Sequence, residues 1–288
     1  MWKDKAMRLL MLSAASTSIF LVALIFIFLM KESAPFALKP GIGALIDRQW
    51  IPVSFVQEHF GILSLVTGSA LVTGLSMLFT IPLSVLGAIY IAEIASPVER
   101  EILKPFIELL ASIPSVVLGF FGLVVLAPLI KNLFGLGTGL SALTGALLLT
   151  LMAIPTVITL SEDAIMSVPR AYKDASQALG ASDLQTIFQV IIPAALPGII
   201  AAIMLGVGRV IGETMAVLMV TGNSAIMTWS PLAPVRTMTA TIAAEMGEVS
   251  FGSMHYQALF WIGLVLLAVT FILNVIAQRV LVRYGMMK

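Results

Sequence analysis

Cysteine is absent from this chain, and charged residues and histidine are scarce. Without cysteine, neither a disulfide framework nor a thiolate metal site can form. Only 11% of the 288 residues are charged, 59% are hydrophobic, and the mean hydropathy is +1.07. Because average soluble domains carry about 25% charged residues, this composition excludes an ordinary soluble domain. The net charge of +1 also argues against a nucleic-acid partner.

Long uncharged runs take the place of a charged surface. A run of at least about 18 to 20 apolar residues is long enough to span a bilayer. We therefore predict a single all-α membrane domain over residues 1–288 with six transmembrane helices, at about 9–30, 60–92, 109–130, 139–161, 194–222 and 256–278. The first is predicted to be a retained helix, because its apolar core exceeds the roughly 7 to 15 residues of a signal peptide and no small-residue cleavage site closes it.

The distribution of lysine and arginine predicts the orientation, since cytoplasmic loops retain these residues. One set of alternate loops, together with both termini, holds ten: Lys3, Lys5, Arg8, Arg100, Lys104, Arg170, Lys173, Arg279, Arg283 and Lys288. The opposite loops hold five: Lys31, Lys39, Arg48, Lys131 and Arg236. We therefore expect a multi-pass protein of the cytoplasmic (inner) membrane with both termini in the cytoplasm.

Residues suited to catalysis are few. The two histidines, His59 and His255, fall near the predicted outer surface, and no H-E-x-x-H or G-x-S-x-G motif occurs. A phosphate-binding G-x-x-x-x-G-K-[ST] loop is also missing, so nucleotide energy is expected from a partner. We expect a chain that is not an enzyme and that uses no metal and no cofactor.

The glycine cluster Gly206–Gly212, "GVGRVIG", lies within the fifth predicted span. It lacks the spacing of a dinucleotide-binding loop and does not follow a strand. Gly208 and Gly212 form a small-x-x-x-small pair, which favours the close approach of a neighbouring helix. We interpret the cluster as a helix-packing feature.

Residues 162–193 are predicted to form a charged cytoplasmic loop with two short helices. Ser167 is a candidate cap for the first helix, and Gly180 is expected to end it. Ser182 and Gln185 have the spacing of a capping box for the second helix.

The first of these helices has an apolar face made mostly of small residues. Its members recur at steps of three and four: Val168, Ala171, Tyr172, Ala175, Ala178 and Leu179. Such a helix cannot bury itself within an isolated loop. Three arrangements are open, because it can lie on the membrane, pack on its own chain, or enter the groove of a partner.

The segment "DASQALGASDLQTIFQVIIP" resembles the E-A-A-x3-G-x9-I-x-L-P loop of importer-type ABC transporter permeases. The corresponding residues are Asp174, Ala175, Ser176, Gly180, Val190, Ile192 and Pro193, with mild replacements at four of them. The resemblance implies the importer-type ABC permease fold, in which a cytoplasmic coupling helix docks into a cleft of a separate ATPase. The implied coupling residues are Ala171, Tyr172, Asp174, Ala175, Ser176, Ala178, Leu179 and Gly180.

Three further segments resemble the PstC-type permease of the phosphate importer: Gly208–Asn223, Arg236–Glu248 and Ala258–Asn274. With the coupling loop, the similarity extends from Phe60 onward and more loosely over the first span. It implies a permease subunit that forms half of a pathway for inorganic phosphate. The implied partners are a sister PstA-type permease, two ATPase subunits, an extracytoplasmic phosphate-binding protein, phosphate and membrane lipid.

Arg209 and Glu213 place two full charges in the fifth predicted span. A charge near the bilayer centre costs at least about 2.5 to 3.5 kcal/mol and usually faces a cavity or a partner. On a continuous helix the two residues share a face, and they can pair. The residues alone leave a structural ion pair and a transport role open. The resemblance favours Arg209 as a phosphate ligand, since guanidinium can donate two hydrogen bonds to an oxyanion, and Glu213 as the residue that orients it.

Thr214 is a further candidate for the pathway, although helical hydroxyls commonly bond the preceding turn. On the predicted outer side, Arg236, Glu245 and Glu248 lie in or near a short predicted helix, "TATIAAEMGE". Two interpretations are open there, the docking of a binding protein and a solvated loop helix. For the function, the alternatives are another oxyanion, such as molybdate, tungstate or sulfate, and a passive channel or scaffold.

Overall fold

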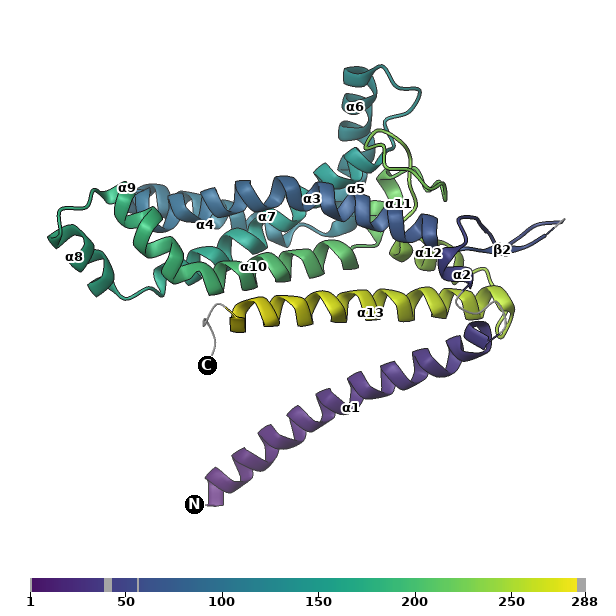
Figure 1. The fold of residues 1–288 in the computed structure, drawn as a ribbon, viewed down its shortest axis with the longest axis horizontal. Coiled ribbons are helices and arrows are strands. Elements are labelled where there is room, and N and C mark those ends of the chain that lie inside the picture. The colour runs from purple at the N-terminus through teal and green to yellow at the C-terminus, as the bar shows by residue number, and fades with distance from the viewer. Residues whose placement is uncertain (1, 39–42, 56, 284–288) are drawn as a thin grey trace.

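The computed structural model describes residues 2–38, 43–55 and 57–283, and most of them are helical (Figure 1). Among these residues, six helices are long and apolar enough to cross a membrane. They are Lys5–Leu38, Leu63–Ile94, Ser115–Phe134, Ala142–Met166, Asp183–Gly212 and Met254–Ile276. The predictions of an all-α membrane protein and of six spans are confirmed.

The elements follow one another with short connections. The α-helices are α1 (Trp2–Leu38), α2 (Gly43–Ile46), α3 (Leu63–Ile89), α4 (Pro97–Ser112), α5 (Ser115–Phe121), α6 (Ala127–Phe134), α7 (Ala142–Met166), α8 (Arg170–Ala178), α9 (Asp183–Thr186), α10 (Ile192–Gly212), α11 (Met215–Val220), α12 (Met238–Glu245) and α13 (Met254–Arg283). Three π-helical turns, η1 (Tyr90–Ile94), η2 (Gly122–Leu126) and η3 (Ile187–Ile191), continue α3, α5 and α9. The strands β1 (Trp50–Ile51) and β2 (His59–Phe60) pair antiparallel.

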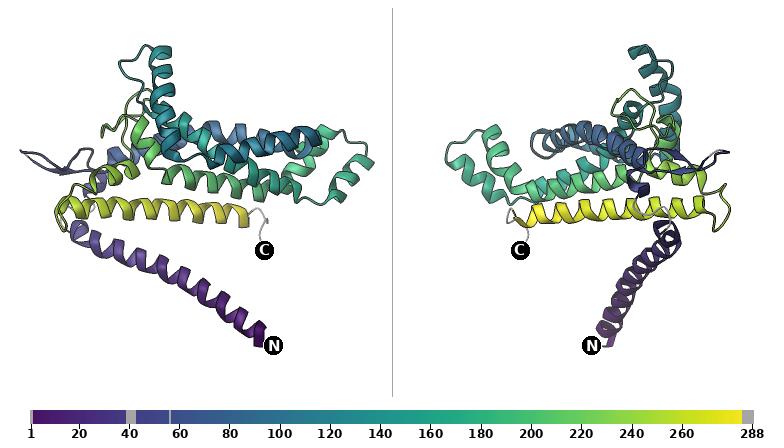
Figure 2. Two further views of the ribbon diagram at one scale, coloured as in Figure 1. Left: turned by 180° about the vertical axis from the view of Figure 1, so that it is seen from behind. Right: turned by 45° about the vertical axis from the view of Figure 1, so that its right-hand side comes forward.

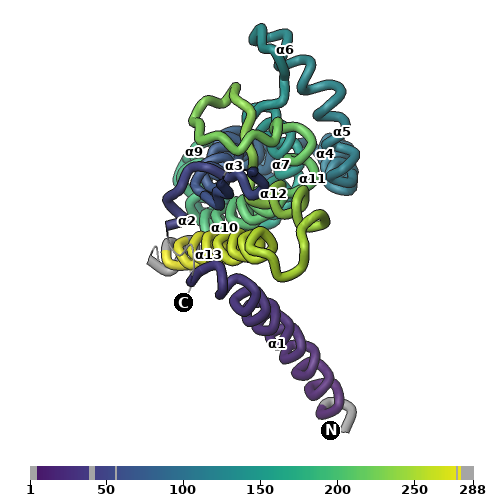
Figure 3. The backbone as a smooth tube through the Cα atoms, turned by 90° about the vertical axis from the view of Figure 1, so that its right-hand side faces the viewer, coloured from purple at the N-terminus to yellow at the C-terminus, as the bar shows by residue number. Residues whose placement is uncertain are grey.

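The helices α3, α7 and α10 form the centre of an elongated bundle, and α13 runs along α10 (Figures 1 and 2). The helix α1 packs on α13 near the β hairpin and diverges from the bundle toward its own N-terminus (Figure 3). The helices α8 and α9 lie at one end of the bundle, and the hairpin lies at the other. The start of α1 and the end of α13 point toward the α8–α9 end, as an even number of spans requires.

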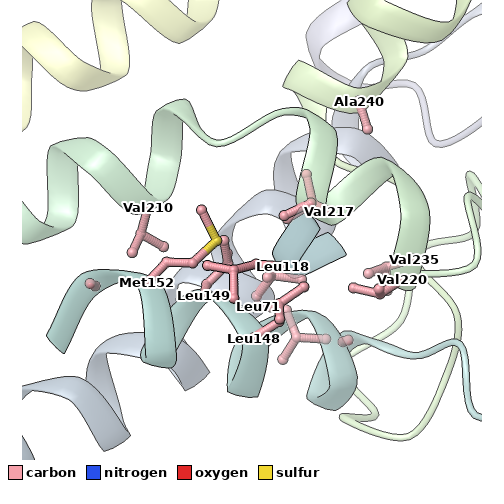
Figure 4. Packing of buried hydrophobic residues seen from close by; sticks show 14 of the residues in the cluster. Leu71, Leu118, Leu148, Leu149, Met152, Val210, Val217, Val220, Val235 and Ala240 are labelled. Atoms are coloured by element: carbon pink, nitrogen blue, oxygen red, sulfur yellow. The ribbon is translucent and has the colours of Figure 1, made fainter. Parts of the chain in front are cut away.

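The central core joins α3, α7 and α11, which are far apart in the sequence. Leu148, Leu149 and Met152 of α7 lie against Leu71 of α3 and Val217 of α11, and all five are buried (Figure 4). Burial of one such side chain contributes roughly 1.5 to 3 kcal/mol in water. Between helices in lipid, close van der Waals packing takes over this role. This core holds α11 against α7 and α5.

Each end of the bundle has its own apolar cluster. At the hairpin end, Phe36, Trp50 and Leu259 are buried together and join α1, β1 and α13. At the α8–α9 end, Ile89 and Ile165 are buried with residues of η3 and α10. One end of α3 packs in each of these clusters, so α3 extends from one end of the bundle to the other.

Two of the expected spans are interrupted. The predicted span at 109–130 crosses Ile113 and Pro114, which are extended between α4 and α5. Proline disfavours helical geometry in the residue before it, so the chain bends here, and α6 stands across the direction of the bundle (Figure 1). The predicted span at 194–222 ends as a helix at Gly212, because Glu213 has an extended backbone with ψ 133°. A separate short helix, α11, then begins at Met215.

Candidate functional site

The segment with α8 and α9 has the local structure that its sequence indicates. Gly180 adopts φ +88°, a left-handed conformation in which a side chain is strained. Ser182 accepts a hydrogen bond from the Gln185 amide, and the Gln185 side chain accepts one from the Ser182 amide. The predicted capping box is confirmed. It begins a continuous helical run through α9, η3 and α10.

The predicted cap at Ser167 is wrong. The helix α7 continues to Met166, and the Ser167 hydroxyl donates to the Ala164 carbonyl of that helix at 2.7 Å. The helix α8 instead begins after Pro169, whose fixed φ suits a helix start. Pro169 therefore separates two helices, and serine ends the first rather than starting the second.

The apolar face of α8 is uncovered. No residue of α8 is buried, and Leu179, which follows it, is 90% exposed. The exposed residues include six of the predicted coupling residues that carry this face or flank it: Ala171, Tyr172, Asp174, Ala175, Ala178 and Leu179. Val168 is the exception, because it is half-buried against the cluster of Ile165. Of the three open arrangements, packing against the rest of this chain is therefore excluded for most of the apolar face of α8.

Ser176, another predicted coupling residue, makes a side-chain contact within the loop. Its hydroxyl lies 2.9 Å from that of Thr186. Gln177 donates to Asp183 at 2.8 Å. Both contacts join α8 to α9. The two short helices are thus held as one unit that presents the exposed face of α8 to its surroundings.

Arg209 lies in the last turn of α10, close to the helix break, and its side chain is exposed. Its Nη1 donates to the Thr156 hydroxyl of α7 at 2.8 Å. The other exposed members of the same helix face are Ala201, Leu205, Gly208 and Gly212. One cation therefore stands on a surface of small and apolar side chains, with most of its five N–H donors unoccupied in the described structure.

The predicted pairing of Arg209 with Glu213 is wrong. Because α10 ends at Gly212, Glu213 does not continue the helix face of Arg209, and no ion pair joins the two described side chains. The Glu213 carboxylate instead accepts a hydrogen bond from the Ala216 amide at 3.1 Å. It thereby satisfies a free N–H in the first turn of α11. The predicted pairing required an unbroken helix from Arg209 to Glu213, and the helix ends between them.

Thr214, beside the break, and Thr221, at the end of α11, use their hydroxyls locally. Thr214 donates to the Gly212 carbonyl at 3.2 Å, and Thr221 donates to the Val217 carbonyl at 2.8 Å. The backbone carbonyl of Glu213 accepts from Thr239 of α12 at 2.8 Å. The break is thus stabilised by hydrogen bonds on both sides, and α12 is attached directly to it.

The expected close packing at Gly208 and Gly212 does not occur within this chain. A Cβ at either position would meet open space. At Gly206, by contrast, a Cβ would collide with Val157 of α7, so this glycine allows α10 to approach α7. The exposed glycines leave the backbone next to Arg209 accessible.

At the hairpin end, Glu245 accepts hydrogen bonds from three different side chains. The Trp50 indole N–H donates at 3.1 Å, and Arg236 Nη1 forms an ion pair at 2.6 Å. His255 Nε2 lies 2.8 Å from the second carboxylate oxygen. The carboxylate is only 17% exposed. The predicted helix over this region is confirmed as α12, with Thr237 as its cap.

These contacts favour a structural role for Arg236 and Glu245, since they join β1, α12 and α13. Arg236 also donates through Nε to the Asn223 carbonyl at 3.0 Å. Glu248 differs, because it is exposed and lines an open pocket of about 720 Å³ between the hairpin and α12.

The contacts of Thr156, Trp50 and His255 were not foreseen from the sequence. Thr156 is a single hydroxyl in an apolar span, and Trp50 and Glu245 are 195 positions apart. Of these three residues, only His255 has a local sequence signal for a polar contact, because it is a polar residue at the start of an apolar run. Among the described residues, no group of three or more His, Cys, Asp or Glu is arranged to hold a metal ion.

At the α8–α9 end, α4 begins in a second capping box. The Glu99 carboxylate accepts from the Ser96 amide at 2.7 Å, and the Ser96 hydroxyl accepts from the Glu99 amide at 3.3 Å. The first of these hydrogen bonds is the main reason that the pKa of Glu99 is lowered from its ordinary value. The carboxylate is therefore ionised at neutral pH and stabilises the start of α4.

Comparison with known proteins gives consistent results. A family model described as "Binding-protein-dependent transport system inner membrane component" matches residues 82–284. The "Probable ABC transporter permease protein YqgH" of Bacillus subtilis is 42% identical over 228 residues, which are 79% of this chain and 74% of that protein. The "Phosphate transport system permease protein PstC" of Mesorhizobium japonicum is 33% identical over 262 residues, which are 84% of this chain and 79% of that protein.

Solved structures show the same fold. A bacterial alginate ABC transporter, in complex with its alginate-bound periplasmic protein, aligns with a TM-score of 0.62 at 18% identity, covering 99% of this chain and 98% of that chain. The inward-facing MetNI methionine ABC transporter aligns with a TM-score of 0.58 at 17% identity, covering 79% and 94%. The family model and the relatives together establish that this chain belongs to the inner membrane components of binding-protein-dependent transport systems.

Proposed function

We propose that this chain is a permease subunit of an ATP-driven importer of inorganic phosphate and forms half of its translocation pathway. The observation that carries the proposal is the Arg209 guanidinium. It is exposed on the single chain, it stands in the last turn of an apolar helix, and one threonine hydroxyl is its partner. A charge that is retained at such a cost within a membrane protein indicates a transport pathway.

Arginine suits an oxyanion for a geometric reason. Its planar guanidinium stays charged and can donate two parallel hydrogen bonds to two oxygens of one phosphate. The carboxylate of Glu213 is engaged with the Ala216 amide and does not compete for these donors. Relatives named "Phosphate transport system permease protein PstC", including one from Haemophilus influenzae that is 30% identical over 91% of this chain, support phosphate as the cargo.

The uncovered surfaces support the proposed partners. The exposed face of α8, from Ala171 to Gly180, would dock into a separate ATPase subunit, and two such subunits are expected for two permeases. The exposed face of α10 around Arg209 would meet a sister permease of the PstA type, with the pathway between them. The pocket beside Glu248 would receive an extracytoplasmic phosphate-binding protein. The apolar outer surfaces of the remaining spans, such as α1, would face membrane lipid.

The direct test is transport by the assembled complex. This chain, its sister permease, the ATPase and the binding protein would be reconstituted in proteoliposomes, and uptake of radiolabelled phosphate would be measured with and without ATP. We expect ATP-dependent uptake that excess unlabelled phosphate suppresses and that molybdate, tungstate and sulfate do not. Suppression by one of these oxyanions alone would reassign the cargo. Uptake that ignores ATP would favour a passive channel.

The proposed orientation has its own test. Both termini and α8 are assigned to the cytoplasm, and the hairpin and α12 to the outside, on the basis of the lysine and arginine counts. Because the chain has no cysteine, single cysteines can be introduced cleanly. Ser182→Cys should react with an impermeant maleimide only from the cytoplasmic side, and Ser253→Cys only from outside. The opposite labelling pattern would reverse the orientation.

A further inference from the structure

One ion pair connects α8 to the membrane helices. Lys173 of α8 places its Nζ 2.8 Å from the Glu93 carboxylate of η1, the π-helical turn that ends α3. The side chains of α8 make their other recorded hydrogen bonds to α9, through Ser176 and Gln177. Within the described part of the chain, the Lys173–Glu93 pair is therefore the one ionic link between α8 and a spanning helix outside its own loop.

The Glu93 end of this pair is firmly held. Its side chain is 12% exposed, whereas that of Lys173 is 38% exposed. Arg100 of α4 donates to the carbonyls of Ile91 and Ala92, at 2.7 Å to each through Nη2. Ile91 is buried. The turn η1 is thus fixed to α4 and to the core, so a displacement of Lys173 would act on a rigid part of the molecule.

The helix α3 extends from this turn to the opposite end of the bundle (Figure 1). There the Ser69 hydroxyl accepts a hydrogen bond from the Met238 amide of α12 at 2.9 Å. A Cβ at the neighbouring Gly68 would collide with the Arg236 carbonyl, so α3 lies directly against the segment that precedes α12. Any movement of α3 along its axis would therefore reach α12.

The helix α12 in turn contacts the break beside Arg209. Thr239 donates to the Glu213 carbonyl at 2.8 Å, which is a backbone group freed by the end of α10. The contacts therefore form an unbroken series from α8 through Glu93, α3 and α12 to the residue that follows the last turn of α10. A series of contacts alone does not establish energetic coupling, but it identifies the contact at which coupling can be interrupted.

We propose that the Lys173–Glu93 pair transmits the movement of α8 to α3, and through α12 to the helix break beside Arg209. Lys173 and Glu93 are positioning residues, since neither touches the cargo. The proposal rests on the proposed docking of α8 to an ATPase. It differs from a plain stabilising role, because the loss of a pair used only for stability would leave the phosphate imported per ATP hydrolysed by each assembled complex unchanged.

The test uses the complete reconstituted complex with ATP, radiolabelled phosphate and the binding protein. Four variants of the pair are compared: Lys173→Met, Lys173→Arg, Glu93→Gln and the charge reversal Lys173→Glu with Glu93→Lys. The matched control is Lys104→Met with Glu162→Gln, which removes another ion pair of 3.2 Å between α4 and α7, with a lysine that is also 38% exposed. The readouts are the amount of co-purified ATPase and the phosphate imported per ATP hydrolysed.

We expect Lys173→Met and Glu93→Gln to keep the ATPase bound while phosphate per ATP falls at least about fivefold. Lys173→Arg and the charge reversal should restore at least half of the original ratio, and the control should leave it unchanged. An unchanged ratio in the single variants would overturn the proposal. Failure of both the single and the reversed variants to assemble would also overturn it, because the pair would then serve assembly. If the unaltered chain neither bound the ATPase nor imported phosphate, the proposed function itself would fall.

Discussion

Two arginines of this chain, Arg209 and Arg236, have opposite surroundings. Arg236 is 22% exposed, forms an ion pair with Glu245 at 2.6 Å and donates to the Asn223 carbonyl. Arg209 is exposed and has one recorded partner, the neutral hydroxyl of Thr156. In the sequence, each of the two has a glutamate within nine positions. Only the structure distinguishes the arginine that forms an ion pair from the arginine whose recorded partner among the described residues is a neutral hydroxyl.

The difference lies in how the backbone presents the nearby glutamate. Around Arg236, the helix α12 carries Glu245 back toward the arginine, and Trp50 and His255 complete the carboxylate's contacts. Around Arg209, the helix ends before Glu213, so the carboxylate turns to α11. A pair spaced by four residues meets only when the helix between them is intact.

The largest effect is expected from removing the charge of Arg209. Arg209→Met should lower phosphate uptake per assembled complex on the order of a hundredfold, since two charge-assisted hydrogen bonds together contribute roughly 3 kcal/mol. Arg209→Lys should lose about tenfold, because one ammonium cannot reproduce the two-pronged contact. ATP-dependent uptake in proteoliposomes measures both. The amount of assembled complex is the control, and uptake near normal in Arg209→Lys would mean that a point charge is sufficient.

A smaller effect, on stability rather than on transport, is expected at the other arginine. Arg236→Met leaves Glu245 with two donors in place of three, and should lower the free energy of unfolding by about 2 to 3 kcal/mol, as for a partly buried pair that loses one partner. Thermal unfolding of the complex should shift downward by several degrees. Glu245→Gln is the companion variant, and it should weaken the same three contacts. If the unfolding temperature were unchanged in both variants, the cluster around Glu245 would not stabilise the fold.

The smallest effect is expected at Glu213. Glu213→Gln keeps an oxygen that can accept the Ala216 amide, so uptake should stay within about threefold of the original. Glu213→Ala removes the cap of α11 and should cost about 1 kcal/mol. Uptake and thermal stability of the two variants are compared side by side. A severe loss in Glu213→Gln alone would point to the ionised carboxylate as part of the pathway.

Local sequence signals predicted much of the fold. The six spans follow from uncharged runs, and the Ser182–Gln185 capping box and the left-handed Gly180 follow from residues that act over three or four positions. The short helix α12, predicted from the segment "TATIAAEMGE", belongs to the same class. In each case the residues that determine the structure are neighbours in the chain, so no knowledge of tertiary contacts is needed.

The remaining features depend on distant contacts. The end of α10 at Gly212 is stabilised by Thr239, which is 26 positions from Glu213. The cluster at Glu245 needs Trp50 from a hairpin near the start of the chain. Gly206 is packed while Gly208 is open, although the two look alike in the sequence, because only one of them faces α7. Hydropathy reports none of these, since it does not record which side of a helix meets which neighbour.

We propose that Arg209 binds the anion and that Arg236 stabilises the fold. The most direct test is ATP-dependent phosphate uptake per assembled complex for Arg209→Met and Arg236→Met, measured in parallel in the same proteoliposomes. We expect a loss on the order of a hundredfold for Arg209→Met and a change within about threefold for Arg236→Met, since an intact complex that has folded retains its pathway. Equal losses in the two variants, or near-normal uptake by Arg209→Met, would contradict it.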